Sequence, residues 1–155
     1  MLFGAAALAL LGGTVTACGS PPPPPEVDEL AAQLDRARSD SQLATDAAAA
    51  TPPPPTAQAL TAVASERSAH AQALSDELTR MAGKKAPTTT AASTTAQPAN
   101  APTTKDVIAA LRQSADSAAQ LAASQSGYRA GLLGSIAASC TAAYTVALVP
   151  AGAPQ

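Results

Sequence analysis

Aromatic residues are almost absent from this chain, whose 155 residues include two tyrosines, one phenylalanine and no tryptophan. Alanine supplies most of the 46% hydrophobic content instead. Alanine is the best helix former, but each alanine side chain buries little apolar area. The composition therefore predicts an all-α chain of one domain, with a small core and modest stability.

Basic residues are scarce as well, since the first one is Arg36 and the net charge is −2. No basic stripe is present, which argues against nucleic acid or an anionic membrane surface as a partner. No serine is placed with a base and an acid as a catalytic triad requires, and no glycine-rich phosphate loop occurs. The sequence therefore predicts that the chain is not an enzyme and uses no cofactor.

The N-terminus has the pattern of an export signal. Residues 2–11 form an apolar run, and small residues follow up to Ala17. Val15-Thr16-Ala17-Cys18 resembles the lipobox of bacterial lipoproteins, in which the cysteine sulfur receives diacylglycerol and the chain is cut before that cysteine. The resemblance implies a signal peptide over residues 1–17 and a lipid anchor at Cys18. An uncleaved membrane anchor is the alternative.

Five prolines, Pro21 to Pro25, follow the predicted lipidation site. A proline run adopts polyproline II and rises about 3.1 Å per residue, so this run could hold a domain about 15 Å from the membrane. The alternative is that it only stops a helix. Residues 18–25 are therefore interpreted as the lipidated cysteine and its linker.

Four later segments have the 3.6-residue apolar period of amphipathic helices. We expect them at 26–50, 56–83, 105–124 and 126–149, followed by a tail over residues 150–155. Their predicted inner faces are Val27, Leu30, Ala31, Leu34 and Ala37; Leu60, Val63, Ala71, Leu74, Leu78 and Met81; Val107, Ile108, Leu111, Ala115, Ala118 and Ala122; and Leu132, Leu133, Ile136, Cys140 and Tyr144.

The connections differ in length and composition. Residues 51–55 are a short link, which favours antiparallel packing of the first two helices. Residues 86–104 are rich in Thr, Ala, Ser and Pro, and we expect a disordered crossover there. Residues 124–127 are a weak break, compatible with an antiparallel turn or with one continuous helix.

The last segment carries no charge after Arg129. It is bulky on one side and small on the other, where Gly134, Ala138, Thr141, Ala142 and Thr145 lie. Because both sides could pack a partner closely, we expect it to be the most buried helix of a bundle. As an alternative, Ala130 to Val149 is long enough for a transmembrane span.

Two stretches resemble an alanine-rich, ferritin-like domain of actinobacterial lipoproteins whose function is uncharacterised. They are E-R-S-A-H-A-Q-A-L from Glu66 to Leu74 and S-G-Y-R-A-G-L-L-G-S-I-A-A-S-C from Ser126 to Cys140. The resemblance covers about residues 26–149. It implies a ferritin-like antiparallel four-helix bundle with a long central crossover, and it implies no activity.

The best polar constellation is Glu66, His70 and Glu77, which share one sector of the second helix. They are weak candidates for a metal or acid–base site, and the alternative is a solvated helix edge. Di-iron bundles need carboxylates from all four helices and two Glu-x-x-His motifs. The chain has one histidine and no acid in its last helix, so we predict no metal centre.

Two further residues, Arg67 and Cys140, each have more than one interpretation. Arg67 projects toward an apolar stripe, so it either snorkels at the rim or pairs inside with a carboxylate such as Asp35. Cys140 is either a buried thiol that behaves as a small hydrophobic residue or a thiol with a redox or intermolecular role. Arg112 and Asp116 are four residues apart and predict a surface ion pair.

These patterns predict a cell-envelope lipoprotein on the extracytoplasmic side of the cell membrane, tethered to lipid by its acylated N-terminus. Its helical domain would bind or scaffold an envelope protein without catalysing a reaction. A metal-binding ferritin-like protein is the alternative function.

Lipidation is directly testable. Mass spectrometry of the membrane-extracted N-terminal peptide is expected to show a diacylglyceryl group on Cys18. An intact Met1, or a free thiol at Cys18, would contradict the lipobox interpretation.

Overall fold

A computed structural model describes residues 25–82 and 100–149 of the chain. Five predictions lie wholly or mostly outside these ranges: the signal peptide, the lipidation of Cys18, the proline-rich linker, the Thr- and Pro-rich crossover, and the tail over residues 150–155. The predicted bundle lies almost entirely within them.

All regular structure of the described residues is helical. The elements are α1 (Pro25–Ala49), α2 (Pro54–Ala82), α3 (Thr104–Ser124) and α4 (Gly127–Ala142), and α4 continues into a π-helical turn, η2 (Ala143–Ala147). These bounds lie close to those that the apolar periodicity predicts. The all-helical bundle is therefore confirmed.

Local chemistry explains where the helices begin. Thr103 caps α3, because its hydroxyl accepts a hydrogen bond from the Asp106 N–H while the Asp106 carboxylate accepts from the Thr103 N–H at 2.7 Å. This is a capping box, and the hydrogen bonds from Thr103 lower the pKa of Asp106. Gly127 opens α4 with φ of +56°, a left-handed conformation that glycine adopts without strain. Residues 124–127 therefore form a turn between two separate helices, and the interpretation as one continuous helix is wrong.

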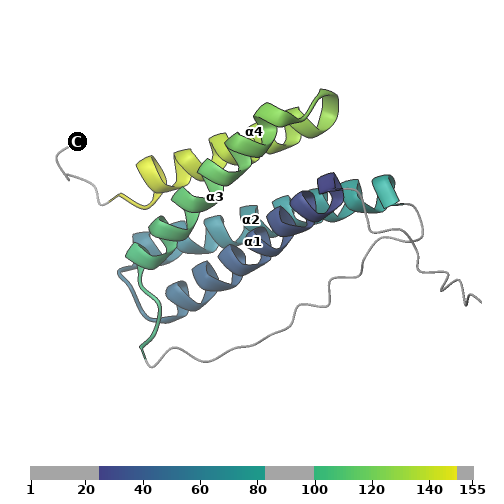
Figure 1. Cartoon of the computed structure of the whole chain (residues 1–155). Helices are drawn as coiled ribbons and strands as arrows, with labels where there is room; N and C mark the ends of the chain where they lie inside the picture. The colour runs from purple at the N-terminus through teal and green to yellow at the C-terminus, as the bar shows by residue number, and fades with distance from the viewer. Residues whose placement is uncertain (1–24, 83–99, 150–155) are drawn as a thin grey trace, which may run out of the picture.

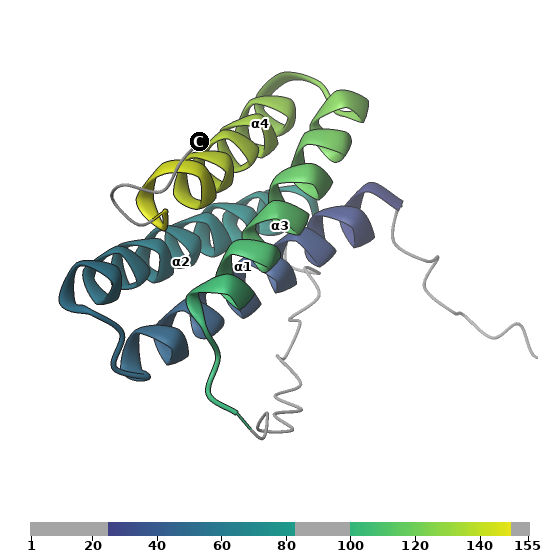
Figure 2. The ribbon, with the colours of Figure 1, turned by 90° about the vertical axis from the view of Figure 1, so that its left-hand side faces the viewer.

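The four helices form two hairpins, α1 with α2 and α3 with α4, and the second hairpin lies across the first (Figure 1). Figure 2 shows α3 beside α1, and α4 on the same side of the first hairpin as α3. Within each hairpin the two helices are antiparallel, whereas α2 and α3 run in the same direction (Figure 1). The end of α2 and the start of α3 therefore lie at opposite ends of the bundle.

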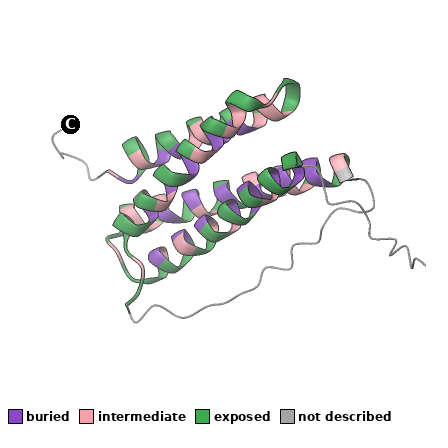
Figure 3. Ribbon diagram, viewed as in Figure 1, coloured by how far each residue is buried: buried purple, intermediate pink, exposed green. Residues whose placement is uncertain are grey.

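The core lies between the two hairpins, where the buried residues of all four helices face one another (Figure 3). The largest fully buried side chains are Leu30, Leu60, Leu74, Val107, Leu111, Ser114, Leu133, Ile136 and Cys140. No aromatic residue is among them, so alanines such as Ala37, Ala44 and Ala118 occupy the remaining core positions. The predicted inner faces of the helices are confirmed, with Met81 and Tyr144 among the residues at their margins.

The expectation that α4 is the most buried helix is wrong. Its bulky side is buried through Leu133, Ile136 and Cys140, but its small side faces solvent over residues 134, 138, 141, 142 and 145. A Cβ placed on Gly134 would meet nothing within 4 Å. Periodicity separates the two sides correctly, but no helix of the described chain covers the small one.

The exposed side of α4 is relevant to the alternative that Ala130 to Val149 spans a membrane. Residues Gly127–Ala147 are long and apolar enough to cross a membrane, with a mean hydropathy of 1.4, and 22% of an 18-residue window of this stretch is buried inside the bundle. The exposed large hydrophobic residues of the described chain, Tyr128 and Val146, both belong to it. The transmembrane alternative stays a prediction.

Candidate functional site

Polar side chains from all four helices occupy the bundle interior. They are Asp40 on α1, Arg67 on α2, Ser114 on α3 and Cys140 on α4, and each is at most 6% exposed. We call these four residues the central cluster. Polar groups at this depth cost free energy unless they are hydrogen-bonded, so their partners decide what the cluster can do.

The cluster is built on one carboxylate oxygen. Oδ2 of Asp40 accepts from Nε of Arg67 at 3.1 Å and from the Ser114 hydroxyl at 2.6 Å, and it lies 3.0 Å from Nη2 of Arg67. The snorkelling interpretation of Arg67 is therefore wrong. Pairing inside the bundle is correct, but the partner is Asp40 rather than Asp35, which lies near Arg38 at 3.8 Å on the surface.

The spacing of Asp40 and Ser114 from the apolar residues of their helices indicates that both face the interior, although neither is apolar. On α1, Asp40 lies three residues after the buried Ala37 and four before the buried Ala44. On α3, Ser114 lies three residues after the buried Leu111. These are core spacings of a helix, so a polar residue there must face the interior whatever its type.

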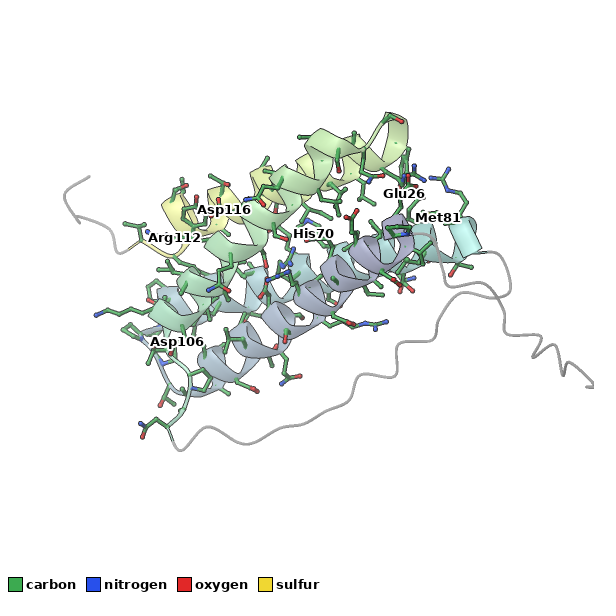
Figure 4. All side chains as sticks on the ribbon, viewed as in Figure 1. Glu26, His70, Met81, Asp106, Arg112 and Asp116 are labelled. Carbon is green, nitrogen blue, oxygen red and sulfur yellow. The ribbon has the colours of Figure 1, made fainter. Side chains whose placement is uncertain are left out.

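His70 extends the cluster toward the surface, and Figure 4 shows it about half-way along the bundle. Its Nδ1 lies 3.1 Å from Nη1 of Arg67. Because a guanidinium only donates, Nδ1 must accept, and the imidazole proton then belongs on Nε2. Burial lowers the pKa of His70, Arg67 lowers it further, and Glu66 opposes both. The imidazole is therefore neutral at pH 7.

Glu66, His70 and Glu77 share a side of α2, but the structure gives each a different partner. Glu66 accepts from the Ser139 hydroxyl of α4, and the buried Glu77 pairs with Arg80. Within residues 25–82 and 100–149, no three His, Cys, Asp or Glu side chains are arranged to hold a metal ion. The Nδ1 lone pair of His70 is also occupied by Arg67, which leaves no free acceptor on its ring.

Cys140 has the surroundings of a structural thiol. It is 1% exposed, and burial raises its pKa; Arg67 counteracts that rise, whereas Asp40 and Glu66 add to it. A thiol with a raised pKa stays protonated at neutral pH and is a poor nucleophile. The geometry therefore favours the interpretation of Cys140 as a small buried side chain.

Cation–π contacts connect α4 to its neighbours. The guanidinium of Arg112 lies 5.3 Å from the centroid of the Tyr144 ring, and that of Arg80 lies 4.8 Å from the Tyr128 ring. No ion pair of the described chain joins Arg112 to Asp116 (Figure 4). The predicted surface pair is therefore wrong, because Tyr144 of η2 offers Arg112 a contact with another helix.

A second polar region is a surface groove of about 340 Å³ between α1 and α3. It is lined by Glu29, Ala32, Gln33, Arg36, Ser117, Gln120, Leu121 and Ser124. At its base, Nε2 of Gln33 donates to the Ser117 hydroxyl at 2.6 Å. The sequence alone does not indicate this groove, because the groove depends on which helices become neighbours.

Comparisons with family models, with curated proteins and with solved structures found no match to this chain. The central cluster itself offers no activated nucleophile and no open metal ligand set among the described residues. The cluster instead connects three helices inside the bundle. Asp40 of α1 pairs with Arg67 of α2 and accepts a hydrogen bond from Ser114 of α3.

Removing only one partner of the Asp40–Arg67 ion pair is expected to destabilise the fold. Asp40→Ala leaves the Arg67 guanidinium buried without its counter-charge and is expected to lower the free energy of unfolding by about 3–5 kcal/mol. The double variant Asp40→Leu/Arg67→Met is expected to unfold at the same urea concentration as the wild type or at a higher one, because both desolvated charges are gone. Asp35→Ala serves as the exposed control, with an expected change of about 0–1 kcal/mol. A double variant less stable than Asp40→Ala would contradict this account.

The His70 environment predicts a pH dependence. Because the folded-state pKa is lowered from 6.5, the unfolded chain binds a proton first as the pH falls. The contribution of His70 is therefore complete above pH 6.5 and is lost as the pH falls from there toward the folded-state pKa. Urea midpoints at pH 7.5, 6.5 and 5.5 are expected to fall for the wild type and to stay nearly level for His70→Gln. Equal slopes for the two proteins would show that His70 is not responsible.

Proposed function

We propose that this chain is a lipid-anchored, non-enzymatic domain of a bacterial cell envelope, and that its helical bundle binds or scaffolds another component there. The observation that carries the non-enzymatic part is the position of Arg67. A permanent cation of the chain itself lies in the bundle interior, and it uses the carboxylate of Asp40 that a metal ion would otherwise need.

The ferritin-like part of the proposal rests on chain direction. In ferritin-like bundles one long crossover joins the second helix to the third, which requires these two helices to be parallel. The parallel course of α2 and α3 supports this connectivity (Figure 1). Ferritin-like di-iron proteins use a Glu from each of two helices and Glu-x-x-His from the other two, whereas α4 carries no acidic residue.

The anchor rests on the sequence. Cys18 lies seven positions before Pro25, where α1 begins. A diacylglyceryl group on Cys18 would therefore hold the start of α1 near the membrane surface. The start of α4 lies at the same end of the bundle, because Nη2 of Arg129 lies 3.4 Å from Oε2 of Glu26.

Metal content distinguishes this function from the metal-binding alternative. The full chain, exposed to iron, manganese or zinc and then desalted, is expected to retain less than about one ion per chain, because no helix of the described residues offers a free set of ligands. At pH 7.5, added metal is expected to leave the thermal midpoint of the wild type, of His70→Ala and of the surface control Asp116→Asn nearly unchanged. Two tightly held ions per chain that are lost in His70→Ala would transfer the protein to the metal-binding class.

A further inference from the structure

The groove between α1 and α3 has a buried amide at its base. Gln33 is 6% exposed, and it lies among the buried residues of α1, next to Leu34 and three positions after Leu30. A buried amide needs partners for both of its polar atoms. Its Nε2 donates to Ser117, and its Oε1 has no partner within the described part of the chain.

This unpartnered oxygen is open to the groove. Within the described residues, no side-chain nitrogen or oxygen without a partner is fully shielded from solvent. Oε1 of Gln33 must therefore retain some access, and the residue lines the groove. An acceptor on an otherwise buried side chain is available there to a ligand that carries an N–H.

Two opposite charges flank this acceptor. Glu29 and Arg36 also line the groove and are exposed, and neither forms an ion pair or hydrogen bond within residues 25–82 and 100–149. They are seven residues apart on one helix, which places them on the same side with a separation of about 10 Å along the axis. Gln33 lies between them.

We propose that this groove binds a short peptide with free ends, in an extended conformation. Three extended residues span about 10 Å, so a tripeptide can place its carboxylate at Arg36 and its ammonium at Glu29. A backbone N–H between the two ends then reaches Oε1 of Gln33. The volume of about 340 Å³ lies within the range of small-ligand sites. The inference rests on the proposed binding role, to which it gives a ligand class.

The test uses the full chain in a non-ionic detergent at low salt, because salt screens exposed ion pairs. Calorimetry or NMR titration compares trialanine with its N-acetyl and C-terminal amide forms. Trialanine is expected to bind with a dissociation constant on the order of 1 mM. Blocking either end is expected to weaken binding about fivefold, as the loss of one exposed ion pair implies.

Variants connect each end of the peptide to one residue. Arg36→Gln is expected to bind trialanine and its amide equally, and Glu29→Gln is expected to bind trialanine and its N-acetyl form equally. Arg38→Gln and Asp28→Asn, on the same helix outside the groove lining, are the matched controls and should behave like the wild type. Circular dichroism confirms that every variant is folded, since all four positions are on the bundle surface or its margin.

Three results would overturn the proposal: equal binding of all three peptides, the same losses in the control variants, or no saturation at about ten times the expected dissociation constant. Any of these results would leave the diacylglyceryl group on Cys18 and the metal content unaffected. Failure of the peptide site is therefore distinguishable from failure of the proposed envelope function.

Discussion

The completeness of the buried ion pair between Asp40 and Arg67 is the constraint on which the rest of the bundle depends. An alanine-rich core without aromatic side chains gains little free energy from each residue that it buries. Desolvating two charges costs several kcal/mol per ion, which such a core can tolerate only if the pair is complete. The Ser114 hydroxyl supplies a further hydrogen bond to Asp40, so the carboxylate that pairs with α2 also binds a side chain of α3.

The same pair determines the chemistry of its neighbours. Arg67 occupies Nδ1 of His70 and lowers its pKa, so the imidazole offers neither a base nor a metal ligand on that side. Near Cys140 the charges of Arg67 and Asp40 act in opposite directions, and burial remains the largest influence on the thiol pKa. The polar groups of Asp40, Arg67 and Ser114 are therefore engaged in contacts within the bundle rather than free to react.

Helix positions and inner faces could be predicted from the sequence, because they depend on local propensity and a 3.6-residue period. The same period shows that Arg67 is anomalous, because it places this cation on an apolar stripe. It does not identify the carboxylate that pairs with Arg67. Asp35 lies five residues before Asp40, about 140° away around the helix, and only the spacing from Ala37 to Ala44 identifies Asp40 as the inner carboxylate. The exposure of the small side of α4 cannot be predicted from periodicity, because periodicity distinguishes two sides of a helix without showing whether a partner covers each.

The groove cannot be predicted from the sequence either, because it forms only where α1 and α3 lie side by side.

The Asp40–Arg67 pair also differs in kind from a metal centre between helices, because both of its charges belong to the chain itself. In a bundle that holds a metal, carboxylates from several helices converge on the site. These carboxylates repel one another unless the cation is bound. Here the positive charge belongs to α2 itself, so the interior is neutralised as soon as the chain folds, without metal uptake. The Asp40 carboxylate therefore needs no bound cation to balance its charge. The exposed charges of Glu29 and Arg36 lie outside this interior, on the surface groove between α1 and α3.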